Sequence, residues 1–233
     1  AQVGPSGETL IEYSMNQALK AGFNKIIFIV SIKTKKAFKE KFGNSYNGIK
    51  IKYALQEFNP ELRDKPWGTC DALCSAINAV DCPFVVCNGD DIYGEKAFKI
   101  LFNHLKNKST NATLGYKLGE VLSETSEVNR GIFQVKDKKV IEIKEFLGVS
   151  KENLKEKGLS ENDFCSMTMW AFQPPVLRLL NEKLIAFKDK HKGDRKIECL
   201  LPNELNELIK EKKIEIELYP TNEKWFGVTN PED

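Results

Sequence analysis

Two adjacent acidic residues, Asp90 and Asp91, follow a short apolar run at residues 83–88 (PFVVCN). An unbroken apolar run of this length predicts a strand that is buried on both faces. Ligands of open α/β sheets bind beyond the carboxyl ends of the strands, and adjacent carboxylates there suit Mg²⁺, which also takes phosphate oxygens and water. A solvated turn that caps the next helix would use the same residue types. Gly89 favours a site, because its missing side chain lets a ligand approach the backbone.

A second stretch that could bind a ligand, residues 65–69 (KPWGT), leads into a predicted helix at residues 69–80. Gly68 and Thr69 open this helix, whose first turn has unpaired N–H groups and the positive end of the helix dipole. A plain helix start with Thr69 as N-cap would have the same sequence. Gln56 follows a predicted strand, and its amide could both donate to and accept from a nucleobase. A surface position is the alternative for this residue.

Helix and strand patterns alternate along the chain. Helices are expected at residues 9–21, 37–42, 69–80, 95–105, 176–187 and 205–212, and strands at 25–30, 49–55, 83–88, 112–118, 166–172 and 214–219, with a hairpin at 131–143. This alternation predicts a mostly parallel sheet with right-handed crossovers. The strands at 25–30, 83–88 and 111–118 are expected in one central sheet, with Asp90 at its carboxyl edge.

The composition excludes several classes of function. The chain has 233 residues, and its 35 basic and 33 acidic residues give a net charge of +2, which makes no case for nucleic-acid binding. Six cysteines contain no CxxC pair and only two histidines are present, so a zinc site lacks its spacing. Cys82 and Cys87 lie at the two ends of one extended run, too far apart for a disulfide. The absence of a membrane-spanning run and of a signal-peptide layout predicts a soluble, cytoplasmic protein.

In order along the chain, the motifs YALQ, KPWGTCDALCSAINAV and PFVVCNGDDIYG resemble the nucleotidyltransferases that couple a sugar 1-phosphate to a nucleoside triphosphate. The resemblance continues through GPSGETLIEYSMNQALKAGF, GIFQVKDKKVIEIKE, SMTMWAF and WFGVTNPED. It implies a Rossmann-like, three-layer α/β/α fold with a mostly parallel mixed sheet. It also implies one domain over residues 1–233, with a nucleotide-binding part at about 1–118 and a sugar-phosphate-binding part at about 119–233.

The resemblance assigns roles to the nucleotide-binding and metal-binding positions. Gln56 and Gly68, with Thr69 in the same turn, would contact the base, and Asp90 would hold Mg²⁺. Trp67 would stack on the base or the sugar, or pack in the core under the loop. Asp91 would orient the turn or a metal-bound water from outside the metal's own ligand set.

The resemblance also indicates which residues would contact the sugar. Gly131 and Glu145 would face it, and Ser166 and Thr168 lie where the family often has an asparagine that contacts it. The mechanism that it implies has no covalent enzyme intermediate: a phosphate oxygen of the acceptor attacks the α-phosphorus in line, and pyrophosphate leaves.

The sequence departs from the family pattern at two places. The family opens with a strand and a Gly-rich loop ending in a basic residue, whereas this sequence starts with what resembles the segment after that loop, so we expect a truncated or incompletely represented chain. The family also often has a metal-binding aspartate two residues after a Trp. That position is Gly227 here, which leaves Asp233 either as a substitute or as a frayed terminal acid.

Three alternative functions stay open at this point. A nucleotidyltransferase with a non-sugar acceptor such as phosphocholine would use the same core. A glycosyltransferase of the GT-A type also has paired acids at a strand end, but uses a finished nucleotide sugar. A regulator that binds a nucleotide or a sugar phosphate without catalysis is consistent with Gly227 and with the absent loop.

Overall fold

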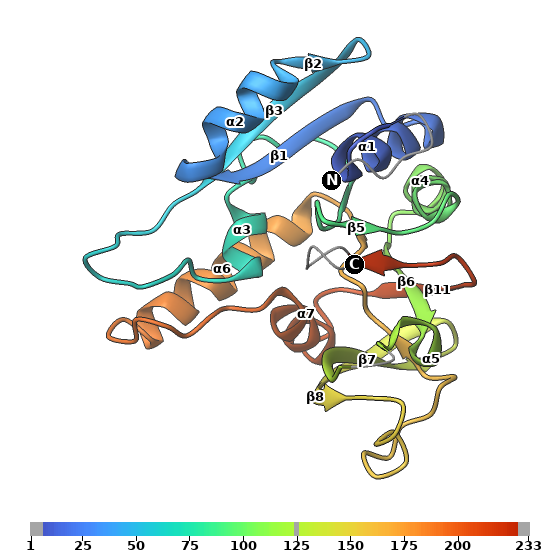
Figure 1. Cartoon of the computed structure of the whole chain (residues 1–233). Coiled ribbons are helices and arrows are strands. Elements are labelled where there is room, and N and C mark those ends of the chain that lie inside the picture. The colour runs from blue at the N-terminus through green and yellow to red at the C-terminus, as the bar shows by residue number, and fades with distance from the viewer. Residues whose placement is uncertain (1–6, 124–125, 228–233) are drawn as a thin grey trace. The chain divides into compact units, whose positions relative to one another are not determined.

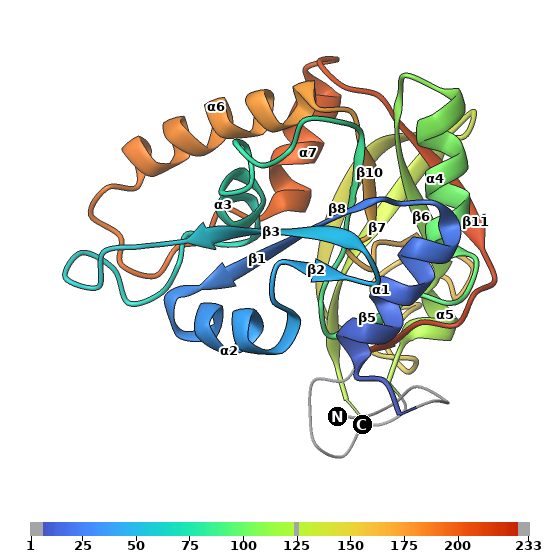
Figure 2. The same ribbon diagram turned by 90° about the horizontal axis from the view of Figure 1, so that it is seen from above.

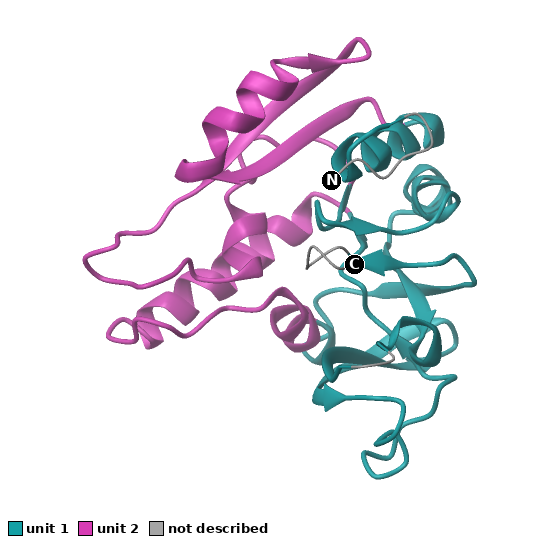
Figure 3. Cartoon of the chain, in the orientation of Figure 1, with its two compact units in different colours: residues 1–22, 85–172, 209–233 teal, residues 23–84, 173–208 magenta. Residues whose placement is uncertain are grey.

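The computed structural model describes residues 7–123 and 126–227 and divides the chain into two compact units (Figure 3). Unit 1 comprises residues 1–22, 85–172 and 209–233, and unit 2 comprises residues 23–84 and 173–208. Both units contain helices and strands (Figure 1), so the mixed α/β class predicted from the sequence is confirmed.

Unit 1 is built on a seven-stranded sheet of order β11-β8-β7-β9-β6-β10-β4, in which β11 also pairs with β6. Helix α4 packs on β6 and β10 and lies beside α1 (Figure 2). The elements of this unit are α1 (Leu10–Ala21), β4 (Phe84–Val86, whose first residue belongs to unit 2), β5 (Asp91–Ile92), α4 (Ala97–Asn107), β6 (Asn111–Lys117), α5 (Leu118–Val121), β7 (Val128–Lys136), β8 (Lys139–Val149), β9 (Phe164–Cys165), β10 (Trp170–Phe172), β11 (Ile216–Thr221) and β12 (Phe226–Gly227).

Unit 2 has a three-stranded sheet of order β1-β3-β2, in which β1 and β3 are parallel and β2 and β3 antiparallel. Helix α2 packs on β1 and β3, and α3 packs on α6. The elements are β1 (Lys25–Ser31), α2 (Ile32–Phe42), β2 (Ser45–Tyr46), β3 (Ile49–Gln56), α3 (Thr69–Cys74), α6 (Pro175–Lys190) and α7 (Leu201–Lys210, whose last residues belong to unit 1).

Local sequence signals determine the ends of α1. Thr9 and Glu12 form a capping box, in which Thr9 N donates to Glu12 Oε2 over 2.8 Å and Glu12 N donates to Thr9 Oγ1 over 3.5 Å. Gly22 ends the helix with φ +117°, and a Cβ there would lie 2.7 Å from Cζ of Phe102. Both the backbone conformation and the neighbouring ring therefore require glycine.

The predicted hairpin at 131–143 is confirmed and is longer than expected, because β7 and β8 extend well beyond it. Lys136 pairs with Lys139, which leaves Asp137 and Lys138 as the two turn residues, with φ +51° and +65°. Positive φ at both positions is the type I′ geometry that matches the twist of the flanking strands. This hairpin carries two of the residues expected to face a sugar.

The sheet arrangement corrects one prediction. The strand at 25–30 does not share a sheet with the strands at 83–88 and 111–118, because β1 pairs with β3 in unit 2 while β4 and β6 belong to the seven-stranded sheet. The pairings of β6, β7, β8, β9 and β10 with one another are antiparallel, and β11–β6 is parallel, so this sheet is mixed with a larger antiparallel share than expected. The prediction that the runs at 25–30 and 83–88 are buried on both faces is also wrong, because β1 and β4 are mostly half-buried. An apolar run does not specify which strand lies beside it.

Three elements are shorter than predicted. The strand expected at 83–88 comprises only Phe84–Val86. The helix expected at 69–80 is α-helical only to Cys74, and turns follow. The strand expected at 166–172 is interrupted between β9 and β10, where Thr168 has φ +58° and leaves the β region.

All six cysteines are free, which confirms that Cys82 and Cys87 are not bridged. No helix among the described residues combines the length and the apolar composition needed to cross a membrane.

Candidate functional site

In unit 2, the turn before α3 is held against the segment at 198–201. Gly68 has φ +100°, and a Cβ there would lie 2.7 Å from the carbonyl oxygen of Cys199. Cys199 N donates to Trp67 O over 2.6 Å, and Cys70 N donates to Cys199 O over 3.0 Å. Glycine is therefore required both by the backbone angle and by the close approach of the second segment.

Thr69 is not the N-cap of α3, so the alternative interpretation of this segment as a helix start capped by Thr69 is wrong. Gly68 occupies the cap position, without a side-chain hydrogen bond to the helix. The Thr69 hydroxyl accepts a hydrogen bond from Leu201 N over 2.9 Å and so satisfies one of the unpaired N–H groups at the start of α7.

Gln56, the last residue of β3, ties this turn to the strand. Its Nε2 donates to Gly68 O over 3.0 Å and to Asp71 Oδ2 over 2.8 Å. Both partners only accept, which fixes the orientation of the amide and leaves Oε1 without a hydrogen bond among the described residues. Asp71 is buried and also pairs with Lys188 over 2.5 Å, so the turn, β3 and α6 are connected through one carboxylate.

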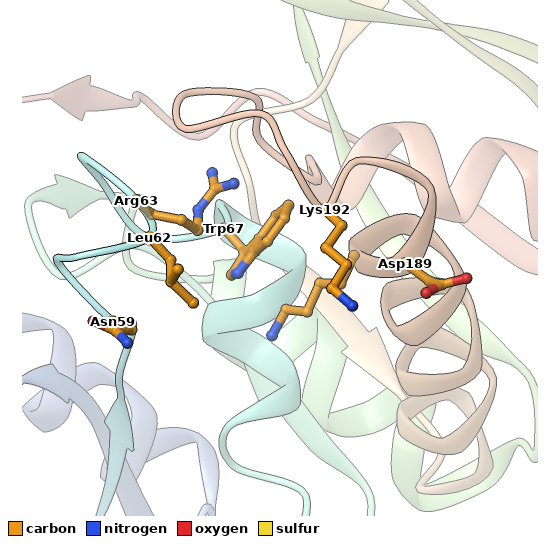
Figure 4. A pocket seen from close by; sticks show the side chains of 7 residues that line it. Asn59, Leu62, Arg63, Trp67, Asp189 and Lys192 are labelled. Atoms are coloured by element: carbon orange, nitrogen blue, oxygen red, sulfur yellow. The ribbon is translucent and has the colours of Figure 1, made fainter.

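Trp67 forms a wall of a pocket of about 340 Å³ within unit 2 (Figure 4). The guanidinium of Arg63 lies 3.4 Å above the centre of the indole ring, and Phe187 contacts the ring edge-on. Arg63 is buried and donates to the carbonyls of Lys65, Asp194 and Ile197. The other residues that line the pocket are Asn59, Leu62, Lys188, Asp189 and Lys192. One face of Trp67 is thus occupied by an internal cation, a contact that the sequence did not predict.

In unit 1, the two adjacent acids have different environments. Asp91 is buried, and its Oδ2 accepts hydrogen bonds from Asn88 Nδ2 over 2.9 Å and from Tyr93 Oη over 3.1 Å. Burial raises the pKa of the Asp91 carboxyl and Asp90 adds to the rise, whereas Asn88, Tyr93 and Trp225 oppose it. Asp90 is exposed and makes no hydrogen bond or ion pair with the part of the chain that the structure describes.

Strand β12 lies antiparallel to β5, so that Gly227 pairs directly with Asp91. A Cβ on Gly227 would lie 3.3 Å from Asp91 Oδ1, but only 2.6 Å from Cη2 of Trp225. The indole ring of Trp225 therefore fills the space that a side chain at position 227 would need. Asp233, the expected substitute for the missing acid, lies outside the described residues.

Three of the four residues assigned to the sugar lie together in unit 1. Gly131 pairs with Glu145 across β7 and β8, and a Cβ on Gly131 would lie 3.4 Å from Glu145 Oε2 and 3.8 Å from Ser166 Cβ. Ser166 N donates to Gly131 O over 2.8 Å. Glu145 is exposed as a whole residue, but loss of water around its carboxyl raises the pKa of that group, and the nearby Arg130 opposes the rise.

The fourth residue, Thr168, connects this group with the acids. Its backbone N donates to Ser166 Oγ over 3.2 Å, and its carbonyl lies 3.4 Å from Tyr93 Oη, whose single proton is shared between this carbonyl and Asp91 Oδ2. Tyr93 is buried and also bonds Asp91, so the strained turn at Thr168 is linked to the residue beside Asp90. Sequence reasoning missed this role of Tyr93, because nothing distinguishes it in the sequence from the other aromatic residues.

The carboxylates of unit 1 fit a hard divalent cation that takes most of its ligands elsewhere. Among the described residues, no three His, Cys, Asp or Glu side chains group closely enough to hold a metal by themselves. Mg²⁺ does not need such a cage, because it binds one or two carboxylates together with substrate phosphates and water. The exposed carboxylate of Asp90, fixed in place by its buried neighbour, meets that requirement.

Comparison with known proteins gives one family and a set of solved structures. A model of the family described as nucleotidyl transferase matches residues 2–225. Inositol-1-phosphate CTP transferase from T. maritima has a TM-score of 0.68 at 14% identity, over 99% of this chain and 80% of its own. A putative glucose-1-phosphate thymidylyltransferase from Bacillus anthracis has a TM-score of 0.68 at 14% identity, over 97% and 79%.

UDP-glucose pyrophosphorylase complexed with UDP-glucose has a TM-score of 0.66 at 14% identity, over 97% of this chain and 83% of its own. None of the curated proteins matches the chain. Similarities at this identity establish the fold, and they confirm the Rossmann-like nucleotidyltransferase fold predicted from the motifs.

Proposed function

The chain belongs to the nucleotidyl transferase family, and on that premise we propose that it joins a sugar 1-phosphate to a nucleoside triphosphate and releases pyrophosphate. The observation that carries this proposal is the connected group in unit 1, where the turn that presents Asp90 is hydrogen-bonded through Asp91, Tyr93 and Thr168 to Ser166. A carboxylate suited to a divalent cation and a cluster suited to sugar hydroxyls thus belong to one network.

In the proposed reaction, an oxygen of the acceptor's phosphate forms a bond to the α-phosphorus of the triphosphate, and the bond from that phosphorus to pyrophosphate breaks. The chain's part is to position two anions against each other. Asp90 would hold Mg²⁺, which when bound neutralises charge on the phosphate oxygens. Asp91 keeps the turn in place, and neither acid serves as a general base.

We assign the sugar hydroxyls to Glu145 and Ser166, with Gly131 leaving room for the sugar. Glu145 is exposed, and a carboxylate can accept from two neighbouring hydroxyls. Since a Cβ on Gly131 would come within 3.4 Å of Glu145 Oε2, a larger residue there would crowd that carboxylate. The turn at Thr168 fixes the position of Ser166 through their hydrogen bond.

We assign the nucleobase to Gln56 and the turn at Gly68, Thr69 and Trp67 in unit 2. Because the Gln56 amide nitrogen already donates to Gly68 O and Asp71, only Oε1 is available to a base, and it would accept from a base N–H. Trp67 contributes its remaining surface to the adjacent pocket. The nucleotide part at about 1–118 and the sugar-phosphate part at about 119–233 are proposed on the same basis.

One observation favours a second candidate, a binding protein without catalysis. Gly227 stands where the family often has a second metal-binding aspartate, and Trp225 occupies the space that its side chain would need. Under this alternative the chain would bind the nucleotide or the sugar phosphate and release no pyrophosphate.

The test is pyrophosphate release by the full chain, measured with a panel of nucleoside triphosphates and sugar 1-phosphates, with phosphocholine as a non-sugar acceptor, in the presence of Mg²⁺ or of EDTA. Asp90→Asn preserves size and should lower turnover by orders of magnitude while the protein still melts cooperatively, because a metal ligand contributes several kcal/mol to the barrier. Glu95→Gln, at an exposed acid close by in the sequence, serves as the matched control and should be silent. Near-normal turnover in folded Asp90→Asn would remove Asp90 from the mechanism.

A further inference from the structure

Two buried hydrogen-bond donors without partners lie side by side in unit 1. Nε of Arg130 and Nε1 of Trp225 are both buried, and neither donates a hydrogen bond to any residue in the described ranges 7–123 and 126–227. The guanidinium carbon of Arg130 lies 5.5 Å from the centre of the Trp225 ring, within reach of a cation–π interaction. Because buried donors in folded proteins are nearly always satisfied, such a pair calls for an explanation.

The protein already fixes both side chains from their other sides. Arg130 donates from Nη1 to Asn129 O over 3.0 Å and from Nη2 to Val121 O over 3.0 Å, which leaves its remaining N–H groups for a ligand. Trp225 lies against Gly227, where any side chain would displace the ring. The ring is thus held beside Asp91, yet its N–H makes no hydrogen bond of acceptable geometry to that carboxylate.

The charge at this place suits an anion. Burial lowers the pKa of Arg130, and Cys165, Asp91 and Glu145 oppose the fall. A guanidinium is not deprotonated in proteins, so Arg130 is charged. A charged guanidinium that is partly removed from water gains from a ligand that carries negative charge on several oxygens, and its fork matches phosphate geometry.

We propose that Arg130 and Trp225 together bind the phosphate of the sugar 1-phosphate acceptor, with Arg130 supplying charge and Trp225 a second N–H. The acceptor is favoured over the triphosphate because the charge of Glu145, which is assigned to the sugar hydroxyls, acts on Arg130 from the neighbouring strand of the same hairpin. This inference rests on the proposed function, and it assigns two residues that the sequence did not identify. Both are only partly buried as whole residues, so a phosphate can reach them after a small side-chain adjustment.

The test compares Arg130→Lys and Trp225→Phe with wild-type full chain. Arg130→Lys keeps the charge and loses the fork, and Trp225→Phe keeps a ring and loses the N–H. Each should raise KM for the sugar 1-phosphate by roughly tenfold, the effect of losing one charge-assisted hydrogen bond, and leave KM for the triphosphate within about twofold. Titration with inorganic phosphate, followed by calorimetry, should show the same weakening without any turnover.

Trp170→Phe is the matched control. Nε1 of Trp170 is also buried without a partner, but this residue is fully buried between Phe133 and Phe172. Trp170→Phe should change thermal stability and neither KM. If Trp225→Phe and Arg130→Lys change only stability, or raise both KM values equally, the inference is wrong and the proposed function stands. If wild type binds inorganic phosphate through Arg130 but no acceptor supports pyrophosphate release, the anion site stands and the proposed function fails.

Discussion

Substitution of Gly68 by alanine tests whether the turn of unit 2 is held as the structure describes it. A backbone at φ +100° and ψ −169° is accessible almost only to glycine, and forcing another residue there costs about 1–3 kcal/mol. The added Cβ would also lie 2.7 Å from Cys199 O, so the segment at 198–199 must shift. That shift weakens the hydrogen bonds Cys199 N to Trp67 O and Cys70 N to Cys199 O, each of which contributes about 0.5–1.5 kcal/mol.

The sum for Gly68→Ala is about 3 kcal/mol, which for a chain of this length lowers Tm by about 6–12 °C. Gly48→Ala is the control, because Gly48 also has a positive φ, +79°, but no atom lies within 4 Å of the Cβ that it would gain. Gly48→Ala should lose only the stability that the unfavourable backbone conformation costs, about 1–2 kcal/mol. Both variants are compared by differential scanning calorimetry, and KM for the nucleotide should rise only in Gly68→Ala. Equal losses of stability in the two variants would refute the close approach of residues 68 and 199.

Two further predictions concern single polar side chains. Gln56→Ala should lower the free energy of unfolding by about 1–2 kcal/mol, because Gly68 O and Asp71 lose a donor. It should also weaken or broaden nucleotide choice while the metal requirement stays intact. Gln134→Ala, at an exposed glutamine, should change neither the stability nor the nucleotide choice in the same assays. The raised pKa of Asp91 means that its contribution to stability is present below its ordinary pKa of 3.8 and is lost as pH rises through the folded value. Urea unfolding from about pH 4 to about pH 7 should therefore show that the free energy of unfolding of Asp91→Asn increases relative to that of wild type as pH rises. A difference in unfolding free energy that does not change with pH would contradict the burial of that carboxylate.

The sequence predicts elements well where the determining contacts are local. The ends of α1 follow from a capping box and a terminal glycine, and the β7–β8 hairpin follows from two alternating runs around a polar turn. It predicts less where distant residues decide. β1 pairs with β3, and its own apolar residues do not specify that partner. The break before β10 depends on Thr168, whose carbonyl is within hydrogen-bond distance of Tyr93, a residue distant in sequence.

The residues of the candidate site show the same difference between local sequence signals and contacts with distant residues. The pairing of Gly131 with Glu145 follows from the hairpin register, and Asp90 follows from an apolar run that ends in acids. Arg130 had no sequence signal, because a basic residue in a strand occurs on most protein surfaces. Trp225 opens the motif WFGVTNPED, but the resemblance assigned no role to its side chain. The unsatisfied donors of these two residues lie near each other only when two segments of unit 1 that are distant in sequence are brought together.

The buried position of Asp91 explains why the strand runs into two acids rather than one. Asp91, the first residue of β5, is held inward by its hydrogen bonds with Asn88 and Tyr93, whereas Asp90, in the bend before it, is exposed to solvent. Burying a carboxylate raises its pKa and is unfavourable in itself, and its two hydrogen bonds offset only part of this. An apolar residue would fill the space with a smaller desolvation cost, but it would not orient Tyr93. The Tyr93 hydroxyl also accepts a hydrogen bond from Asn88 N and lies 3.4 Å from Thr168 O. Asp91 is thus explained by the geometry that it gives to Asp90 and to the turn at Thr168.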